Sequence, residues 1–227
     1  MPIPSIEKLL AAPAPGLAFE MHVNDKPKRV VLPSPHKLGK PASETDLGKL
    51  RALAKDMPEH EEMVRLYGAH DGVKLFNMSE GGTKYTKPAV ELLPIGKWQK
   101  HAEEFLEMDI LEECYPGFYD AGDWAAIGTI EAEGTTLIYF FDGEYNSEPL
   151  AGRIFPVMLD PVMDCDELLA PSLPAFLGSL AADPTEILGR LEMIWDAKIG
   201  GEDLIGNIVG WTPDAASDPD TVLPGQG

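Results

Sequence analysis

With 227 residues, of which 44% are hydrophobic and 25% charged, the chain is long enough to bury a core and has the composition of an ordinary globular protein. Its net charge of −20 lies almost wholly after Lys100, where 26 Asp and Glu accompany only 3 Lys and Arg; such a field repels nucleic acid and anionic lipid and attracts basic surfaces. The two cysteines, Cys114 and Cys165, have no CxxC spacing, which argues against a disulfide framework and a zinc knuckle.

Residues 1–42 are predicted to form a proline-rich extension. Within it, the pattern indicates a short helix over 6–12 and one or two strands over 22–32. The whole chain contains 21 prolines and 22 glycines, which favours many turns over a helical bundle.

Two consecutive helices follow the extension. Ser43 and Asp46 have the layout of a capping box, and apolar residues then recur at helical spacing as far as Met57. Pro58 is well placed to open the second helix, which is expected to end before Gly68.

The apolar period then changes to that of strands. Strands are predicted over 73–76, 90–95, 124–132, 135–142 and 152–159, with a helix over 97–113 and a polar loop over 143–150. The 135–142 strand is apolar on both faces, which is typical of a central strand covered on each side. Pro156 has no N–H to donate, so its strand is expected at an edge or a bulge.

The C-terminal part is predicted to be helical again. Ser172 begins one helix, and Asp183 begins another that continues through Trp195 and stops at Gly200. Residues 201–227 are expected to form a partly mobile tail, because Thr212 to Gly227 contain few apolar groups. This order of elements predicts an α+β domain with one mainly antiparallel sheet.

A search for catalytic and metal-binding patterns finds none that is specific, so we expect no catalytic residue, metal or cofactor. His60 and His70 lie near acidic residues, but their environment is more typical of a surface helix and its exit turn. Another acidic cluster lacks the spacing and glycine of a calcium loop and is expected to be a solvated turn; it comprises Asp160, Asp164, Asp166 and Glu167. Paired carboxylates that could hydrolyse a glycosidic bond remain a possible alternative, with Asp120, Asp123, Asp142 and Glu144 as the candidates.

Several segments together resemble the SUKH superfamily over residues 43–181. Ser43 to Pro58 and Glu62 to Gly72 resemble its opening pair of helices and turn, with Met-Pro in place of Leu-Pro and Asp-Gly in place of Asn-Gly. Later segments resemble its Trp-x-x-Ile-Gly strand, its next strand pair and its closing helix; they are Asp123 to Gly128, Phe141 to Gly143 with Gly152 to Phe155, and Cys165 to Leu180. The resemblance implies a single α+β domain, here 43–200 with an added C-terminal helix, in which helices flank a twisted sheet.

The resemblance also implies a function without catalysis. Bacterial members are mostly immunity proteins that neutralise toxins, often nucleases, while fungal relatives regulate cell-wall synthesis. Because a nuclease binds a polyanion, its cleft is usually basic, and an acidic inhibitor can occupy it. We therefore expect a cytosolic immunity protein with a basic partner, no nucleic acid and no membrane. The alternatives are a regulatory scaffold protein and a carboxylate-dependent hydrolase. The oligomeric state stays open. The expected contacts are Glu103, Glu104, Glu107, Glu112, Glu113, Tyr119, Asp120, Asp123, Glu144, Tyr145 and Glu148.

Overall fold

The computed structural model describes residues 7, 9–12, 14–23, 25–79, 86–106, 120–131, 134–157, 168–191, 193–199 and 202–222. Over these residues the fold is mixed α+β with antiparallel sheets, which confirms the predicted class, but the strands form more than the one sheet that was expected. The chain divides into two compact units, each built from separate stretches of sequence. The first unit comprises Met1–Ile3, Leu38–Val73 and Glu91–Leu177, and the second comprises Pro4–Lys37, Lys74–Val90 and Gly178–Gly227.

Two helices, α2 (Glu44–Leu53) and α3 (His60–Ala69), lie in the first unit. Ser43 caps α2 as predicted: its Oγ accepts a hydrogen bond from the Asp46 N–H at 3.1 Å and donates one to Asp46 Oδ2 at 2.7 Å. Helix α3 begins and ends two residues later than predicted. The buried residues of the two helices recur at helical spacing; they are Leu47, Leu50, Met63, Leu66 and Tyr67.

Three antiparallel strands of the first unit are β6 (Trp124–Ile130), β7 (Thr135–Phe140) and β10 (Ile154–Val157), with β7 between the other two. All six residues of β7 are buried, as expected for the central position. Strand β10 is the edge strand, which confirms the position predicted from Pro156.

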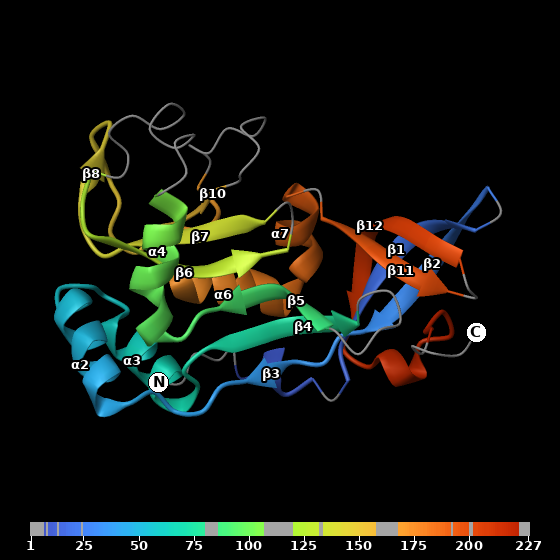
Figure 1. The fold of residues 1–227 in the computed structure, drawn as a ribbon, viewed down its shortest axis with the longest axis horizontal. Helices are drawn as coiled ribbons and strands as arrows, with labels where there is room; N and C mark the ends of the chain where they lie inside the picture. The colour runs from blue at the N-terminus through green and yellow to red at the C-terminus, as the bar shows by residue number, and fades with distance from the viewer. Residues whose placement is uncertain are drawn as a thin grey trace. The chain divides into compact units, whose positions relative to one another are not determined.

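Helix α4 (Trp98–Leu106) packs on β6 (Figure 1). Trp98 fixes the start of this helix: its side chain is buried, its Nε1 donates a hydrogen bond to Leu93 O at 3.0 Å, and its ring meets that of Tyr67 edge-on at 5.2 Å. The remainder of the predicted helix, 107–113, lies outside the described residues. The short elements of this unit are η1 (Ile95–Lys97), β8 (Glu144–Tyr145) and β9 (Glu148–Pro149).

Helices α6 (Leu173–Ala182) and α7 (Pro184–Arg190) begin at the predicted caps. Ser172 Oγ accepts a hydrogen bond from the Ala175 N–H at 3.1 Å, and Asp183 Oδ1 accepts one from the Thr185 N–H at 2.9 Å. Both starts are therefore set locally, by a side chain that accepts from an N–H otherwise lacking a partner.

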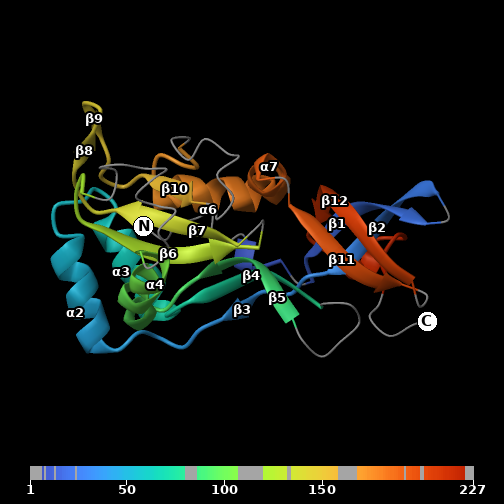
Figure 2. The ribbon, with the colours of Figure 1, turned by 45° about the horizontal axis from the view of Figure 1, so that its top comes forward.

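The main sheet of the second unit has four antiparallel strands in the order β11-β12-β1-β2 (Figures 1 and 2). Their bounds are Gly16–Val23 for β1, Lys26–Pro33 for β2, Ile194–Ile199 for β11 and Glu202–Thr212 for β12. Helix α7 packs on β12. The remaining elements are β3 (Lys37–Leu38), β4 (Val73–Ser79), its sheet neighbour β5 (Thr86–Leu92), and η2 (Ala215–Ser217).

The helix predicted to run from Asp183 through Trp195 is wrong in its second half. Helix α7 ends at Arg190, and β11 begins at Ile194. Trp195 is 4% exposed whereas Ile194 is 53% exposed, which is the alternation of a strand. Ile194 and Trp195 are residue types that favour strands, and β11 pairs with β12, the strand that follows it in the chain, with Ile199 opposite Glu202. The helix start at Asp183 is set by its own cap and does not fix how far the helix continues.

Strands predicted within the N-terminal extension are present, but they begin at Gly16 and not at residue 22, and the tail expected at the other end is wrong for residues 202–212. Residues 16–33 form the complete hairpin of β1 and β2, and 202–212 form β12, which pairs with β1. Strand β12 lies within the expected tail, and its exposure alternates: Ile205 and Val209 are exposed, while Gly206 between them is buried. Gly206 and Gly210 weaken the pattern by which a strand is predicted from the sequence.

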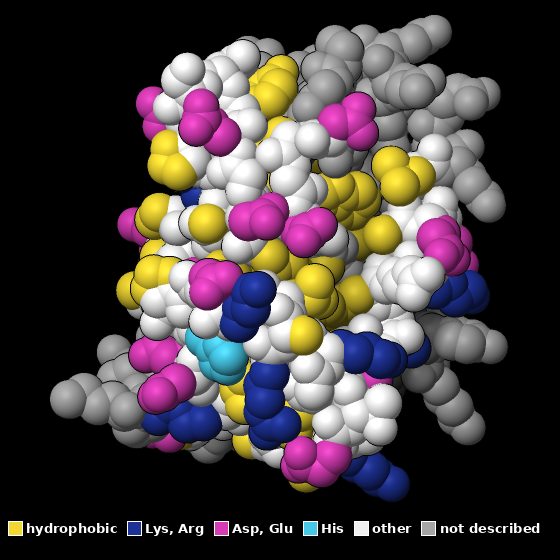
Figure 3. All heavy atoms as spheres, turned by 90° about the vertical axis from the view of Figure 1, so that its left-hand side faces the viewer, with side chains coloured by type: hydrophobic (Ala, Val, Ile, Leu, Met, Phe, Trp, Pro, Cys, Tyr) yellow, Lys and Arg dark blue, Asp and Glu magenta, His cyan; other side chains and the backbone are white. Residues whose placement is uncertain are grey.

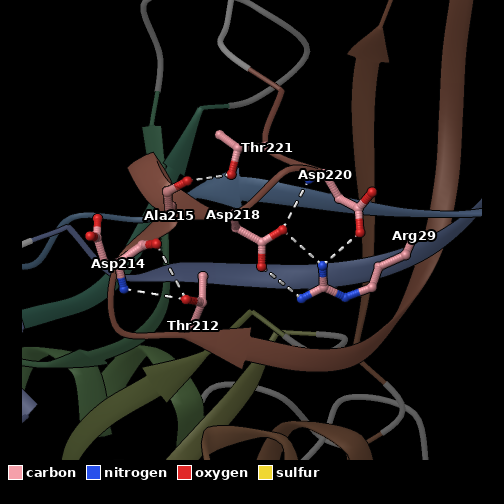
Figure 4. Close-up of polar contacts among 7 residues, drawn as sticks. All are labelled: Arg29, Thr212, Asp214, Ala215, Asp218, Asp220 and Thr221. Carbon is pink, nitrogen blue, oxygen red and sulfur yellow. Dashed lines mark hydrogen bonds and ion pairs between the residues drawn. The ribbon is translucent and has the colours of Figure 1, made fainter.

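A C-terminal strap, which we define as residues 213–222, closes the outer edge of β2 (Figure 4). The Val31 N–H donates to Asp220 O at 3.0 Å, and Val31 O accepts a hydrogen bond from the Val222 N–H at 3.0 Å. The Arg29 guanidinium holds both oxygens of Asp218, at 3.0 and 3.1 Å, and contacts Asp220 at 2.9 Å. These hydrogen bonds lower the pKa of the Asp218 carboxyl and tie the strap to the strand.

Candidate functional site

The candidate site is an acidic surface on the first unit, formed by side chains from three segments. Its described members are Glu103 and Glu104 of α4, Asp120 and Asp123 before β6, and Glu144, Tyr145 and Glu148 of the β8–β9 hairpin. The six carboxylates are exposed and Tyr145 is half-buried. The other four predicted contacts, Glu107, Glu112, Glu113 and Tyr119, lie outside the described residues.

One apolar cluster brings these three segments together. Its buried residues are Ala126, Ile138, Phe140, Leu150, Phe155 and Val157, and the partly buried residues packed on it are Ala102, Ala121, Trp124, Tyr145 and Leu168. Ala102 precedes the two glutamates of α4, and Ala121 and Trp124 lie beside Asp120 and Asp123 in the sequence. The three segments that carry the acidic side chains therefore pack on one apolar cluster, at which Trp124 and Tyr145 remain partly accessible.

Backbone hydrogen bonds lock the turn before β6 against the turn after β7. The Phe141 N–H donates to Asp123 O at 2.7 Å, and the Glu144 N–H donates to Ala121 O at 3.1 Å. Asp142 adds a side-chain bond, since its Oδ1 accepts the Asp123 N–H at 2.5 Å. Two carboxylate-bearing turns thus have a fixed relative position.

Two glycines allow this close crossing. A Cβ added to Gly122 would lie 2.6 Å from Asp142 O, and one added to Gly143 would overlap Ala121 O. Gly143 also has φ of +100°, which an L side chain adopts only with strain. These two glycines are the signal in the sequence from which the crossing of the two turns can be predicted.

The β8–β9 hairpin is equally well defined. Its two turn residues, Asn146 and Ser147, both have positive φ, 51° and 66°, as in the type I′ turn that matches the twist of a hairpin. Tyr145 immediately before the turn packs on the apolar cluster and is held there by this geometry. Its ring is therefore a pre-positioned aromatic group beside the carboxylates.

Among the described residues, three of the six carboxylates have side-chain partners and three have none. Glu103 accepts from Gln99 at 2.9 Å, while Glu104 pairs with Lys100 at 3.1 Å and Glu148 pairs with Arg153 at 3.3 Å. Asp120, Asp123 and Glu144 have no side-chain hydrogen bond or ion pair among the described residues. These three give the surface its uncompensated negative charge.

Figure 3 shows this side of the first unit in space-filling form. In the upper part of the described surface, the charged side chains in view are almost all Asp and Glu, with hydrophobic side chains between them. Lys and Arg side chains gather in the lower part, where they are mixed with acidic ones. Asp and Glu are therefore spread over this face, whereas most of the Lys and Arg that could compensate their charge lie in its lower part.

The geometry gives the hydrolase alternative no support. Hydrolysis by paired acids needs one carboxyl whose pKa is raised by burial, yet Asp120, Asp123 and Asp142 are all exposed. The histidines considered as metal ligands have backbone neighbours: His60 Nδ1 lies 3.0 Å from Ala54 O, and His70 Nδ1 lies 3.3 Å from Gly39 O. The described part of the chain contains no group of three metal-ligating side chains, and 160–167 lie outside it.

Comparison with protein-family models, curated proteins and solved structures finds no match to this chain. Among the helices of the described residues, none combines the length and apolar character needed to cross a bilayer.

Proposed function

We propose that this chain is a cytosolic, non-catalytic binding protein of the SUKH type, which neutralises a basic, nuclease-type bacterial toxin through the acidic surface. The observation that carries the proposal is the rigid arrangement of Asp120, Asp123 and Glu144, without cationic partners among the described residues, around a half-buried Tyr145.

The order of elements within 43–181 supports the family resemblance. Helices α2 and α3, strands β6, β7 and β10, and helix α6 follow one another in the order that the resemblance implies. The Asp71-Gly72 turn also has a structural reason: Gly72 has φ of +93°, and Asp71 Oδ1 accepts the Ile95 N–H at 2.9 Å. An Asn side chain offers the same acceptor oxygen, so Asp in place of Asn preserves the turn.

The electrostatics of the surface support a cationic partner. Exposed carboxylates contribute little to the stability of their own fold, whereas together they attract a basic protein over about 8 Å at physiological ionic strength. Such attraction mainly raises the association rate. Tyr145 and Trp124 then supply the kind of central aromatic contact that usually dominates the affinity of a protein interface.

In this mechanism inhibition is stoichiometric. The acidic surface covers the basic cleft in which a nuclease would hold the phosphates of its substrate, so the inhibitor and the nucleic acid compete for the same cations. The locked turns matter because a surface that is already ordered loses little conformational entropy on binding.

The test measures the binding of this protein to the product of the neighbouring gene. A second assay asks whether co-expression of this protein rescues cells from the toxicity of that product. We expect the affinity of the wild-type protein to fall as salt is raised. The triple variant Asp120→Lys, Asp123→Lys, Glu144→Lys should lower the association rate by about tenfold or more and abolish rescue.

A matched control separates the effect of the acidic surface on binding from the effect of the protein's net charge. Three exposed acids elsewhere, in the variant Asp56→Lys, Glu61→Lys, Glu186→Lys, change the net charge by the same amount. This control should retain rescue and most of the association rate. Equal losses in the two triple variants, or binding that does not respond to salt, would refute the electrostatic mechanism.

A further inference from the structure

Phe76 of β4 has a backbone conformation that is rare for a bulky residue. Its φ is 51°, in the left-handed region, although the residue lies within a strand and its side chain is fully buried. An L residue is strained there because its Cβ comes close to the following carbonyl oxygen. Such strain persists only where the surrounding structure holds the residue in place.

His36 supplies the contact that holds the Phe76 backbone. The Phe76 N–H donates to a side chain, His36 Nδ1, at 3.0 Å. The rings of His36 and Trp211 both meet the Phe76 ring edge-on, with 4.9 and 6.3 Å between the centroids. Packing therefore fixes the Phe76 side chain, and the hydrogen bond to the imidazole fixes its N–H.

One peptide group, between Leu75 and Phe76, can relieve the strain by itself. Because a peptide is planar, it rotates through ψ of Leu75 and φ of Phe76 together. A rotation of about 180° takes φ of Phe76 from 51° to about −130°, which is ordinary for a strand. The same rotation turns the Phe76 N–H away from His36 and brings the Leu75 carbonyl toward it. At the ring, a donor is thus exchanged for an acceptor.

Protonation changes His36 in the complementary sense. The neutral ring accepts the Phe76 N–H at Nδ1, whereas a protonated ring carries a hydrogen on both nitrogens and can only donate. Nδ1–H would therefore face the Phe76 N–H, donor against donor, until the peptide rotates. After the rotation Nδ1–H has a carbonyl oxygen as its acceptor.

Charged side chains do not control the titration of this ring. The pKa of His36 is lowered by burial, and the Leu9 backbone opposes this shift; neither cause is a charged group. Among the described residues, the charged ones nearest along the chain to the segments that contact the ring or Phe76 are Glu7, Lys37, Lys74 and Asp214. The protonation state of the ring therefore depends on its buried surroundings and on the backbone groups beside it.

We propose that His36 and the Leu75–Phe76 peptide form a proton-driven conformational switch within the second unit. When the ring is neutral, it accepts the Phe76 N–H and keeps Phe76 in its strained conformation. When the ring takes up a proton from the solvent, the peptide rotates, Nδ1–H donates to Leu75 O, and Phe76 returns to ordinary strand geometry. Relief of the strain favours the rotated form, and burial of the charged ring opposes it.

NMR spectroscopy of the full-length protein tests the rotation. We expect a midpoint below pH 6.5, because burial disfavours the charged ring, and above about 4, because the rotation supplies an acceptor for it. Across this midpoint the protection of the Phe76 N–H from hydrogen exchange should fall by about tenfold or more. The three-bond coupling between its amide and α hydrogens should rise to the value of a strand. The Asn77 N–H belongs to the next peptide, donates to Pro35 O at 3.1 Å, and should stay protected.

Two substitutions provide controls. His36→Asn keeps an acceptor for the Phe76 N–H but does not titrate, so both NMR signals of Phe76 should stay constant over the same pH range. His60→Asn replaces a histidine of the first unit whose Nδ1 also contacts a backbone oxygen, that of Ala54. This variant should show the same change at Phe76 as the wild type.

Three results would overturn the proposal. The first is an equal loss of protection at Phe76 and Asn77, which indicates a general opening of the strand. The second is an unchanged Phe76 coupling after the ring signals show that His36 has taken up its proton. The third is a change at Phe76 that persists in His36→Asn.

Discussion

His36 is expected to make the stability of the protein depend on pH between 6.5 and about 4. Its Nδ1 accepts a hydrogen bond from the Phe76 N–H at 3.0 Å, and its ring meets the Phe76 ring edge-on at 4.9 Å. Burial lowers the pKa of His36 from 6.5 to about 4, and an interaction with the Leu9 backbone offsets only part of this. A protonated ring would carry a hydrogen on Nδ1 and could no longer accept from Phe76.

The direction and the size of this pH effect on the free energy of unfolding follow from the difference between the pKa of His36 in the unfolded chain and in the folded chain. Above pH 6.5 the ring is neutral in both states, and its full contribution to stability is present. As the pH falls from 6.5 to about 4, the unfolded chain takes up a proton that the folded chain does not, so stability is lost. The difference corresponds to at most about 3.4 kcal/mol, and we expect about 2 kcal/mol because solvent screens a ring that is only partly buried.

Urea unfolding across this pH range, for the wild-type protein and for His36→Asn, isolates the contribution. The Asn Oδ1 can accept the Phe76 N–H but does not titrate, so the variant should lose about 2 kcal/mol less than the wild type between pH 6.5 and 4. NMR titration of the ring in the folded protein gives a second measurement. Equal losses in the two proteins, or a folded-state pKa near 6.5, would refute the reasoning.

Three further substitutions test the local structure. Ser43→Ala removes the N-cap of α2 and should lower the free energy of unfolding by about 1 kcal/mol in urea titrations. Ser43→Asp keeps a capping oxygen and should leave the free energy of unfolding nearly unchanged. Gly143→Ala should cost about 1–3 kcal/mol in the same assay and weaken partner binding, because its φ is positive and its Cβ overlaps Ala121 O; unchanged stability would contradict the crossing of the two turns. Tyr139→Phe removes the hydrogen bond that the Tyr139 hydroxyl donates to Glu59 Oε1 at 3.0 Å and should cost about 1 kcal/mol, measured by thermal unfolding; Glu59→Gln keeps an acceptor and should cost less.

The sequence by itself determined those features that depend on neighbouring residues. Ser43 and Asp183 begin helices where predicted, because a cap needs only a side-chain oxygen and the N–H groups two or three residues later. Pro156 marked an edge strand for a similarly local reason, its missing N–H.

Only the tertiary structure decided the features that join distant segments. The sequence predicted one helix through Trp195, but β11 forms there and pairs with β12, the next strand in the chain. The other side of β12 pairs with β1, which lies over 170 residues earlier in the chain than β11 and joins the two strands to a larger sheet. The crossing at Gly122 and Gly143 likewise depends on two turns meeting in space. Strand pairing and close backbone approach are set by contacts far apart in sequence, which no local pattern of residues records.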